Sequence, residues 1–177
     1  MRIPVSILLM SLLGAPGVGA AADRLPARLA ALEDQLALQQ IVTGDYPRAL
    51  DQRNWAGYVA LFTPEGELVV LGRTVKGRAA IAKFLAGMPF GAPGTPPARP
   101  GEIRTLHVIS NLSYRIDGDT AAGGSYWQTI GVRDGQSAVL AAGHYEDLLR
   151  KGKEGRWLFE RRVIDTDLPP PAAAKPQ

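Results

Sequence analysis

Apolar residues recur at helical spacing in the first part of the chain. Between Arg24 and Asn54, leucines follow one another at steps of three and four residues, at Leu25, Leu29, Leu32 and Leu36. This spacing predicts a helix with one apolar face. Gly44 and Pro47 interrupt the run and predict a kink, or a break into two helices, near Asp45.

The next stretch alternates between helical and extended patterns. Trp55–Phe62 predicts a short second helix, ended by the turn-forming sequence Thr63-Pro64-Glu65-Gly66, and Glu67–Gly72 predicts a strand. Gly77–Gly87 predicts a third helix, because its apolar residues have helical spacing. Residues 88–102 contain five prolines and three glycines, which indicates a loop or lid rather than regular structure.

The second half of the chain is dominated by strand-like runs. Four long runs are separated by turn sequences at hairpin-like spacing: Ile103–Ile116, Thr120–Val132, Ala138–Arg150 and Trp157–Asp165. Helices followed by a long antiparallel meander predict an α+β domain, with a sheet that curls around the helices.

The two ends of the chain are expected to lie outside this domain. A basic start is followed by an uncharged, mostly apolar stretch and by the small residues Ala20-Ala21-Ala22. This pattern predicts a signal peptide at residues 1–22, with an uncleaved anchor as the alternative. The domain then spans residues 23–168, and the Pro/Ala-rich residues 169–177 are expected to be a disordered tail. Many Ala, Gly and Arg residues suggest a GC-rich bacterium, so we expect a periplasmic or secreted protein.

Composition removes several classes of function. The formal net charge is +3, but the basic residues are scattered, so no nucleic-acid surface is expected. The chain has no cysteine and two histidines, which excludes thiolate chemistry and makes an all-histidine metal centre an unfavourable interpretation. Neither a phosphate-binding glycine loop nor a nucleophile elbow is found, so no cofactor and no metal is expected.

His107 is the first candidate for chemistry. Side chains alternate along a strand, so His107 and Asn111 are expected to share a polar-leaning face, two pleats apart. Such a face can line a small-molecule pocket or simply be exposed to solvent.

The second candidate is the segment from Tyr46 to Asp51. Five residues of ideal helix turn through about 500°, which leaves these two side chains about 140° apart. The kink at Pro47 can reduce that angle, and a solvated helix end is the alternative.

The later strands carry aromatic and charged residues in alternation. Within each strand, alternate residues are expected to share a face. The sets are Tyr126 with Gln128, Tyr145 with Asp147, and Trp157 with Phe159, Arg161 and Val163. Aromatic rows of this kind are more often core than site. A buried arginine in such a row would need a carboxylate or a ligand anion.

Short motifs follow one another in a fixed order from about Leu32 to Asp165. They are Tyr46…Leu50-Asp51, Trp55…Leu61-Phe62-Thr63-Pro64, Gly77-Arg78…Ile81…Phe84-Leu85, His107…Asn111, Asp117-Gly118-Asp119-Thr120-Ala121, Tyr126, Gly143-His144-Tyr145-Glu146-Asp147 and Gly155-Arg156-Trp157…Arg161. Together they resemble the SnoaL-like branch of the nuclear-transport-factor-2-like superfamily. The resemblance implies a cone in which three N-terminal helices pack on a strongly curved antiparallel sheet, with a pocket between them.

The resemblance also implies a class of chemistry. Relatives include cofactor-free dehydratases such as scytalone dehydratase and a bile-acid dehydratase, polyketide cyclases and isomerases. It implies His107, Asp51 and Tyr46 as catalytic residues, and we take Asn111, Tyr126, Tyr145, Trp55 and Arg161 as the candidates for substrate binding. We therefore expect a lyase or isomerase in which Asp51 holds His107 as the base for a small hydrophobic carbonyl or hydroxy compound.

Two other interpretations remain open. The same fold also serves as a non-catalytic module that binds a small ligand or dimerises through its outer sheet face, and as an accessory subunit. The resemblance allows a homodimer. No stable membrane anchor is expected after processing.

Overall fold

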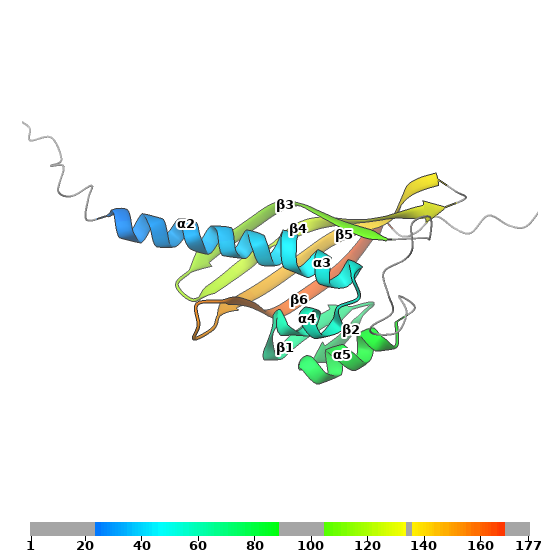
Figure 1. Ribbon diagram of the computed structural model, residues 1–177, viewed down its shortest axis with the longest axis horizontal. Coiled ribbons are helices and arrows are strands. Elements are labelled where there is room, and N and C mark those ends of the chain that lie inside the picture. Colours follow the sequence, from blue (N-terminus) through cyan, green and yellow to red (C-terminus); the bar gives the residue numbers. More distant parts are fainter. Residues whose placement is uncertain (1–23, 89–104, 134–135, 169–177) are drawn as a thin grey trace, which may run out of the picture. The chain divides into compact units, whose positions relative to one another are not determined.

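The computed structural model describes residues 24–88, 105–133 and 136–168 (Figure 1). Two compact units divide the chain, residues 1–34 and 35–177. The predicted signal peptide, residues 89–102 of the predicted loop and the predicted tail lie outside the described residues. Within the described ranges, no helix combines the length and the apolar character needed to cross a membrane.

The predicted interruption near Asp45 is confirmed. Helix α2 (Leu25–Gln39) is followed by the π-helical segment η1 (Gln40–Asp45) and then by α3 (Tyr46–Asp51). Pro47 lies in the first turn of α3, where its missing N–H is not needed. A proline ring clashes with the carbonyl four residues earlier in an α-helix, which explains why the preceding turn is widened.

The two shorter helices are found where the sequence predicts them. Helix α4 (Trp55–Ala60) begins at Asn54, whose side chain accepts a 2.9 Å hydrogen bond from the N–H of Gly57. Helix α5 (Arg78–Ala86) buries Ile81 and Leu85.

Between these helices, the predicted turn at residues 63–66 is wrong. Strand β1 (Phe62–Val70) already begins at Phe62, and β2 (Arg73–Lys76) pairs with it in antiparallel fashion. The register of β1 shifts between Phe62 and Glu67, so Pro64 and Gly66 are accommodated as an irregularity inside the strand.

A six-stranded sheet carries the rest of the fold (Figure 1). Its strands follow the order β2-β1-β6-β5-β4-β3, and the four predicted later strands are β3 (Leu106–Asp117), β4 (Thr120–Arg133), β5 (Gln136–Lys151) and β6 (Trp157–Leu168). These four form the expected antiparallel meander. Strand β1 runs parallel to β6, which makes the sheet mixed. Parallel neighbours cannot be joined by a hairpin, and β1 is joined to the meander by a long crossover.

A bulge in β3 changes which of its residues face the helices. The pairing with β4 shifts between Ser110 and Ser113, and Asn111 has a left-handed φ of 53°. Before the bulge, His107 and Ile109 are the partly buried residues, whereas after it the even-numbered residues are, beginning with Leu112. The predicted common face of His107 and Asn111 is therefore wrong, because the extra residue shifts the alternation by one.

A second bulge has the same effect in β6. Leu149 pairs with Phe159 and Leu148 pairs with Arg161, so Glu160 is the extra residue. As a result Phe159 and Arg162 are both fully buried, and the side chain of Arg161 is 43% exposed. The predicted row of Trp157, Phe159, Arg161 and Val163 on one face is wrong from Arg161 onward, because the extra residue shifts the alternation by one.

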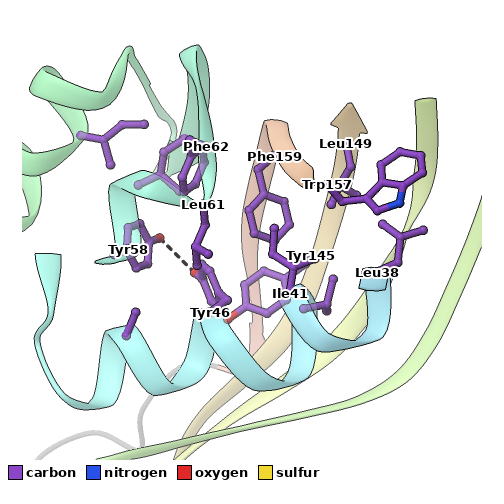
Figure 2. Close-up of a cluster of buried hydrophobic side chains, with 14 of the residues drawn as sticks. Leu38, Ile41, Tyr46, Tyr58, Leu61, Phe62, Tyr145, Leu149, Trp157 and Phe159 are labelled. Carbon is purple, nitrogen blue, oxygen red and sulfur yellow. Dashed lines mark hydrogen bonds between the residues drawn. The ribbon is translucent and has the colours of Figure 1, made fainter. Parts of the chain in front are cut away.

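The core lies between the helices and one face of the sheet. Figure 2 shows Tyr46 and Tyr58 packed beside Phe159 and Tyr145, with Phe62 next to Tyr58. Each of these five rings is at most 2% exposed, and burying a large apolar side chain contributes about 1.5–3 kcal/mol. This aromatic cluster fixes the N-terminal end of α3 against the sheet.

Candidate active site

His107 and Asp51 come together from two elements far apart in the sequence. Asp51 is the last residue of α3, and His107 is the second residue of β3. The Nδ1 atom of His107 lies 2.7 Å from Oδ1 of Asp51. The backbone N–H of His107 also donates to both carboxylate oxygens, at 3.1 and 3.2 Å. One carboxylate thus holds both the ring and the backbone of the histidine.

This contact determines what the imidazole can do. A carboxylate accepts the proton on Nδ1, so the neutral ring carries a lone pair on Nε2. No partner for Nε2 is found among the described residues. The side chains of His107 and Asp51 are 11% and 19% exposed, which leaves the pair accessible but mostly shielded from water. The arrangement has the parts of a general base held in one tautomer.

Tyr46 lies in a different cluster, deeper in the core. Its hydroxyl accepts a 3.1 Å hydrogen bond from the hydroxyl of Tyr58, drawn in Figure 2. Its ring meets that of Tyr145 edge-on, with centroids 5.6 Å apart. Burial, more than any neighbouring charge, raises the pKa of both Tyr58 and Tyr145 well above the usual value. Each therefore stays protonated, as a hydrogen-bond donor, at neutral pH.

A buried ion pair adjoins these tyrosines. Arg162 donates from Nε and Nη2 to the two oxygens of Asp147, at 2.8 and 2.7 Å, and both side chains are fully buried. Tyr114 donates to the same carboxylate at 2.6 Å. Burial alone would lower the pKa of Arg162, but the Asp147 carboxylate outweighs it and the pKa is raised. The guanidinium is thus a permanent cation.

Three aromatic rings surround this cation. The guanidinium carbon lies 3.9–4.1 Å from the ring centres of Tyr46, Tyr145 and Phe159. Such cation–π contacts offset part of the cost of burying the charge. One donor atom, Nη1, has no hydrogen-bond partner in the part of the chain that the structure describes. An unpaired buried donor costs about 1–3 kcal/mol, which reduces the net stability that the ion pair provides.

The remaining predicted binding residues do not gather at the histidine. Arg161 points to Glu67, 3.9 Å away, and Trp55 is 4% exposed, with its ring edge-on to Tyr58. Asn111, Tyr126 and Tyr145 belong to a separate hollow of about 580 Å³, lined also by Ser113, Gly124, Ser125, His144 and Asp167. Tyr126 is 54% exposed, between the buried Ser125 and Trp127, so it lies on the sheet face away from the core.

Sequence reasoning predicted the contact between His107 and Asp51, and it named Tyr46 and Tyr145 separately as candidates. It took Arg161, rather than the buried Arg162, as the candidate arginine. Two sequence signals pointed toward the ion pair of Arg162 and Asp147. One was the expectation that a buried arginine needs a carboxylate, and the other was that Asp147 shares a face with Tyr145. No group of three or more residues suited to holding a metal ion occurs within the described ranges.

The structure defines an α+β protein in which helices pack on one face of a mixed sheet. A model of the SnoaL-like domain matches residues 30–163. The chain therefore belongs to the SnoaL-like family.

Similar proteins are found both by sequence and by structure. Uncharacterised proteins of Mycobacterium tuberculosis strain H37Rv and Mycobacterium bovis are each 27% identical over 149 residues, which cover 80% of this chain and 90% of theirs. A nuclear-transport-factor-2-like protein of Novosphingobium aromaticivorans, with a cystatin-like fold, has a TM-score of 0.66 at 24% identity, covering 85% of this chain and 90% of its own.

Two further solved structures are similar. ActVI-ORFA from Streptomyces coelicolor has a TM-score of 0.63 at 22% identity, covering 75% of this chain and 96% of its own. A Novosphingobium aromaticivorans protein provisionally assigned as a scytalone dehydratase has a TM-score of 0.61 at 22% identity, covering 82% and 98%. At these identities the likeness shows the fold alone.

Proposed function

We propose that this protein is a cofactor-independent acid–base enzyme of the dehydratase, isomerase or cyclase type. Its substrate is a small hydrophobic carbonyl or hydroxy compound. The observation that carries the proposal is the 2.7 Å contact between Nδ1 of His107 and Oδ1 of Asp51, with no hydrogen-bond partner for Nε2 among the described residues. That contact favours a catalyst over a module that only binds, because binding an apolar ligand does not require an oriented base.

The proposed chemistry begins with proton removal. Nε2 of His107 takes a proton from the carbon next to a carbonyl, and the negative charge of Asp51 stabilises the imidazolium that forms. The electron pair of the broken C–H bond becomes an enolate. In a β-hydroxy ketone this pair then forms a C=C bond while the C–O bond breaks. The imidazolium returns its proton to the departing hydroxide, which leaves as water.

The enolate oxygen needs a donor, and the aromatic cluster supplies candidates. Tyr46 and Asp51 are the first and last residues of α3, so their backbones are about 7.5 Å apart along the helix axis, a separation that a small substrate spans. The rings of Tyr46 and Tyr145 lie 3.9 and 4.1 Å from the guanidinium carbon of Arg162, and Nη1 of Arg162 has no hydrogen-bond partner among the described residues. Tyr126 is not included, because it lies on the opposite sheet face.

The first test is the Asp51→Asn variant with a β-hydroxy ketone panel that includes the aldol adduct of benzaldehyde and acetone. Loss of water from this adduct gives benzalacetone, whose conjugation is followed by absorbance. We expect the turnover of an accepted substrate to fall by about 10²–10⁴-fold in Asp51→Asn and His107→Gln. The exposed histidine variant His144→Gln should retain full activity.

A second readout does not depend on finding a substrate. Nitrogen NMR distinguishes the two neutral tautomers of His107, and His144→Gln assigns the signals because the chain has two histidines. The Asp51 carboxylate should hold the proton on Nδ1, whereas the amide of Asp51→Asn can donate to Nδ1 and move the proton to Nε2. An unchanged tautomer, together with no turnover across the panel, would contradict the acid–base proposal.

A further inference from the structure

The leucine face of α2 is exposed. Leu25, Leu29, Leu32 and Leu36 are exposed by 53%, 50%, 54% and 65%. On an ideal helix these four side chains fall within about 60° of one another, as one narrow stripe. We call these four residues the leucine stripe. Isolated exposed leucines are ordinary on a protein surface, but a continuous row along a helix marks an interaction surface.

The stripe is not the face that α2 uses to join the core. The one buried residue of α2 is Leu38, which is 3% exposed. It lies about 150° around the helix from the centre of the leucine stripe. The core contact and the stripe are therefore on nearly opposite sides of the helix, and burying Leu38 does not cover the stripe.

The spacing of the stripe is that of a coiled coil. Leu29 and Leu36 are seven residues apart, as are Leu25 and Leu32. If Leu29 and Leu36 are the a positions of a heptad, Leu25 and Leu32 are the d positions, and both core positions are leucine through the whole stretch. A strict a/d seam of this width fits one partner helix rather than a sheet or a broad pocket.

Two charged residues flank the seam and indicate the partner. In this heptad register, Arg28 takes a g position and Glu33 takes the e position of the next heptad. When two copies of a helix pair in parallel and in register, the g residue of one lies beside the e residue of the partner's next heptad. Arg28 of each copy then faces Glu33 of the other. An antiparallel pair would place g beside g and e beside e, which brings like charges together.

We propose that α2 pairs in parallel with α2 of a second copy of this chain, through the leucine stripe. The stripe supplies the apolar seam, and the two symmetric pairs of Arg28 and Glu33 set its direction. This interface is independent of the proposed catalytic function and differs from the outer sheet face expected from the resemblance.

The cysteine-free sequence permits a direct test. Two cysteine variants of the purified protein are compared. Leu32→Cys places a thiol at a d position, and the control Ala27→Cys places one about 170° around the same helix from the centre of the stripe. In a parallel, in-register pair the two introduced thiols of Leu32→Cys are adjacent and oxidise to a covalent dimer. Ala27→Cys should stay monomeric under the same oxidant. Equal crosslinking of both variants, or none of Leu32→Cys, would overturn the proposal.

The charged residues give a second test, in which sedimentation measures the dimer. The protein is used at up to about 200 μM, because a contact of two heptads is weak. Arg28→Glu or Glu33→Arg alone should weaken the dimer, since like charges then face each other across the seam. Mixing the two single variants should restore it as a heterodimer, as should combining both changes in one chain. Leu32→Lys should raise the dissociation constant at least about tenfold, whereas Ala31→Lys should leave it near the original value.

Circular dichroism should be the same for all these variants, because the changed side chains are exposed. A monomeric parent protein over the whole concentration range would overturn the proposal. So would a dimer that Leu32→Lys leaves intact, since it would use another surface. A dimer weakened by Leu32→Lys but indifferent to the charge exchange would overturn the parallel arrangement.

Discussion

At the scale of single residues, the buried polar groups have the largest energetic consequences. Arg162 and Asp147 have no access to solvent, so each charge depends on the other for its stability. A buried ion pair contributes little net stability, but removing one partner leaves an uncompensated charge. The same logic explains why Tyr114 is directed at this carboxylate.

The Asp147→Asn variant should therefore be strongly destabilised. We expect the free energy of unfolding in urea to fall by about 3–5 kcal/mol, because the Arg162 cation stays buried without its counter-charge. The double variant Asp147→Leu with Arg162→Met should lose less than Asp147→Asn alone. If the double variant were less stable than Asp147→Asn, the ion pair itself would stabilise the fold.

Alkaline pH should destabilise the protein through its buried tyrosines. Burial, followed by the Asp147 carboxylate, raises the pKa of Tyr114 well above its usual value of 10.0. A group whose pKa is higher in the folded state contributes its full stability below the unfolded pKa and loses it as pH rises through the folded pKa. The free energy of unfolding should thus decline above about pH 10.

Urea unfolding at a series of pH values checks this expectation. Tyr114→Phe should flatten the alkaline decline, and Tyr126→Phe, at an exposed position, should leave it unchanged. Equal slopes for the parent and Tyr114→Phe would mean that the Tyr114 hydroxyl does not account for the decline.

The residue scale also shows what the sequence could supply. The pairing of His107 with Asp51 was predicted through a family resemblance, because both residues sit in motifs with family spacing. The choice of Arg161 over Arg162 followed from strict alternation, which is correct only in an uninterrupted strand. Arg161 and Arg162 have the same side chain, and backbone geometry alone decides which of them is buried. Side-chain chemistry could therefore not show which arginine reaches the core.

At the scale of elements, two bulges decide which residues reach the core. Helix boundaries and the four long strands were predictable, because periodicity and turn residues are local signals. A bulge depends on how two strands pair, and its only local trace here is an asparagine, a residue that tolerates a left-handed φ. The faces were therefore correct up to each bulge and shifted by one beyond it.

Position 111 should accordingly tolerate glycine and reject a β-branched residue. Asn111→Val places a branched side chain at a φ of 53°, and we expect a loss of about 1–2 kcal/mol in the free energy of unfolding. Asn111→Gly should cost much less, since glycine adopts this conformation freely. The midpoints of urea unfolding for the two variants make the comparison, and a valine variant as stable as the glycine variant would contradict it.

At the scale of the whole molecule, the predicted signal peptide has a simple test. We propose export followed by cleavage after Ala22, so the intact mass of protein recovered from the periplasm of a bacterial host should correspond to residues 23–177. Ala20→Leu with Ala22→Leu removes the small residues that the peptidase requires and should leave the chain uncut. A full-length parent chain held in the membrane fraction would favour the uncleaved anchor.

The position of β6 has a consequence for how the protein is made. The last strand of the chain lies between β1 and β5 and carries Arg162, so both neighbouring strands have an open edge until synthesis is nearly complete. A chain cut short before residue 157 would lack the cation, the Phe159 ring and the strand that joins the two halves of the sheet. Synthesis must therefore be nearly complete before the sheet can close, which is compatible with the export of an unfolded chain proposed above.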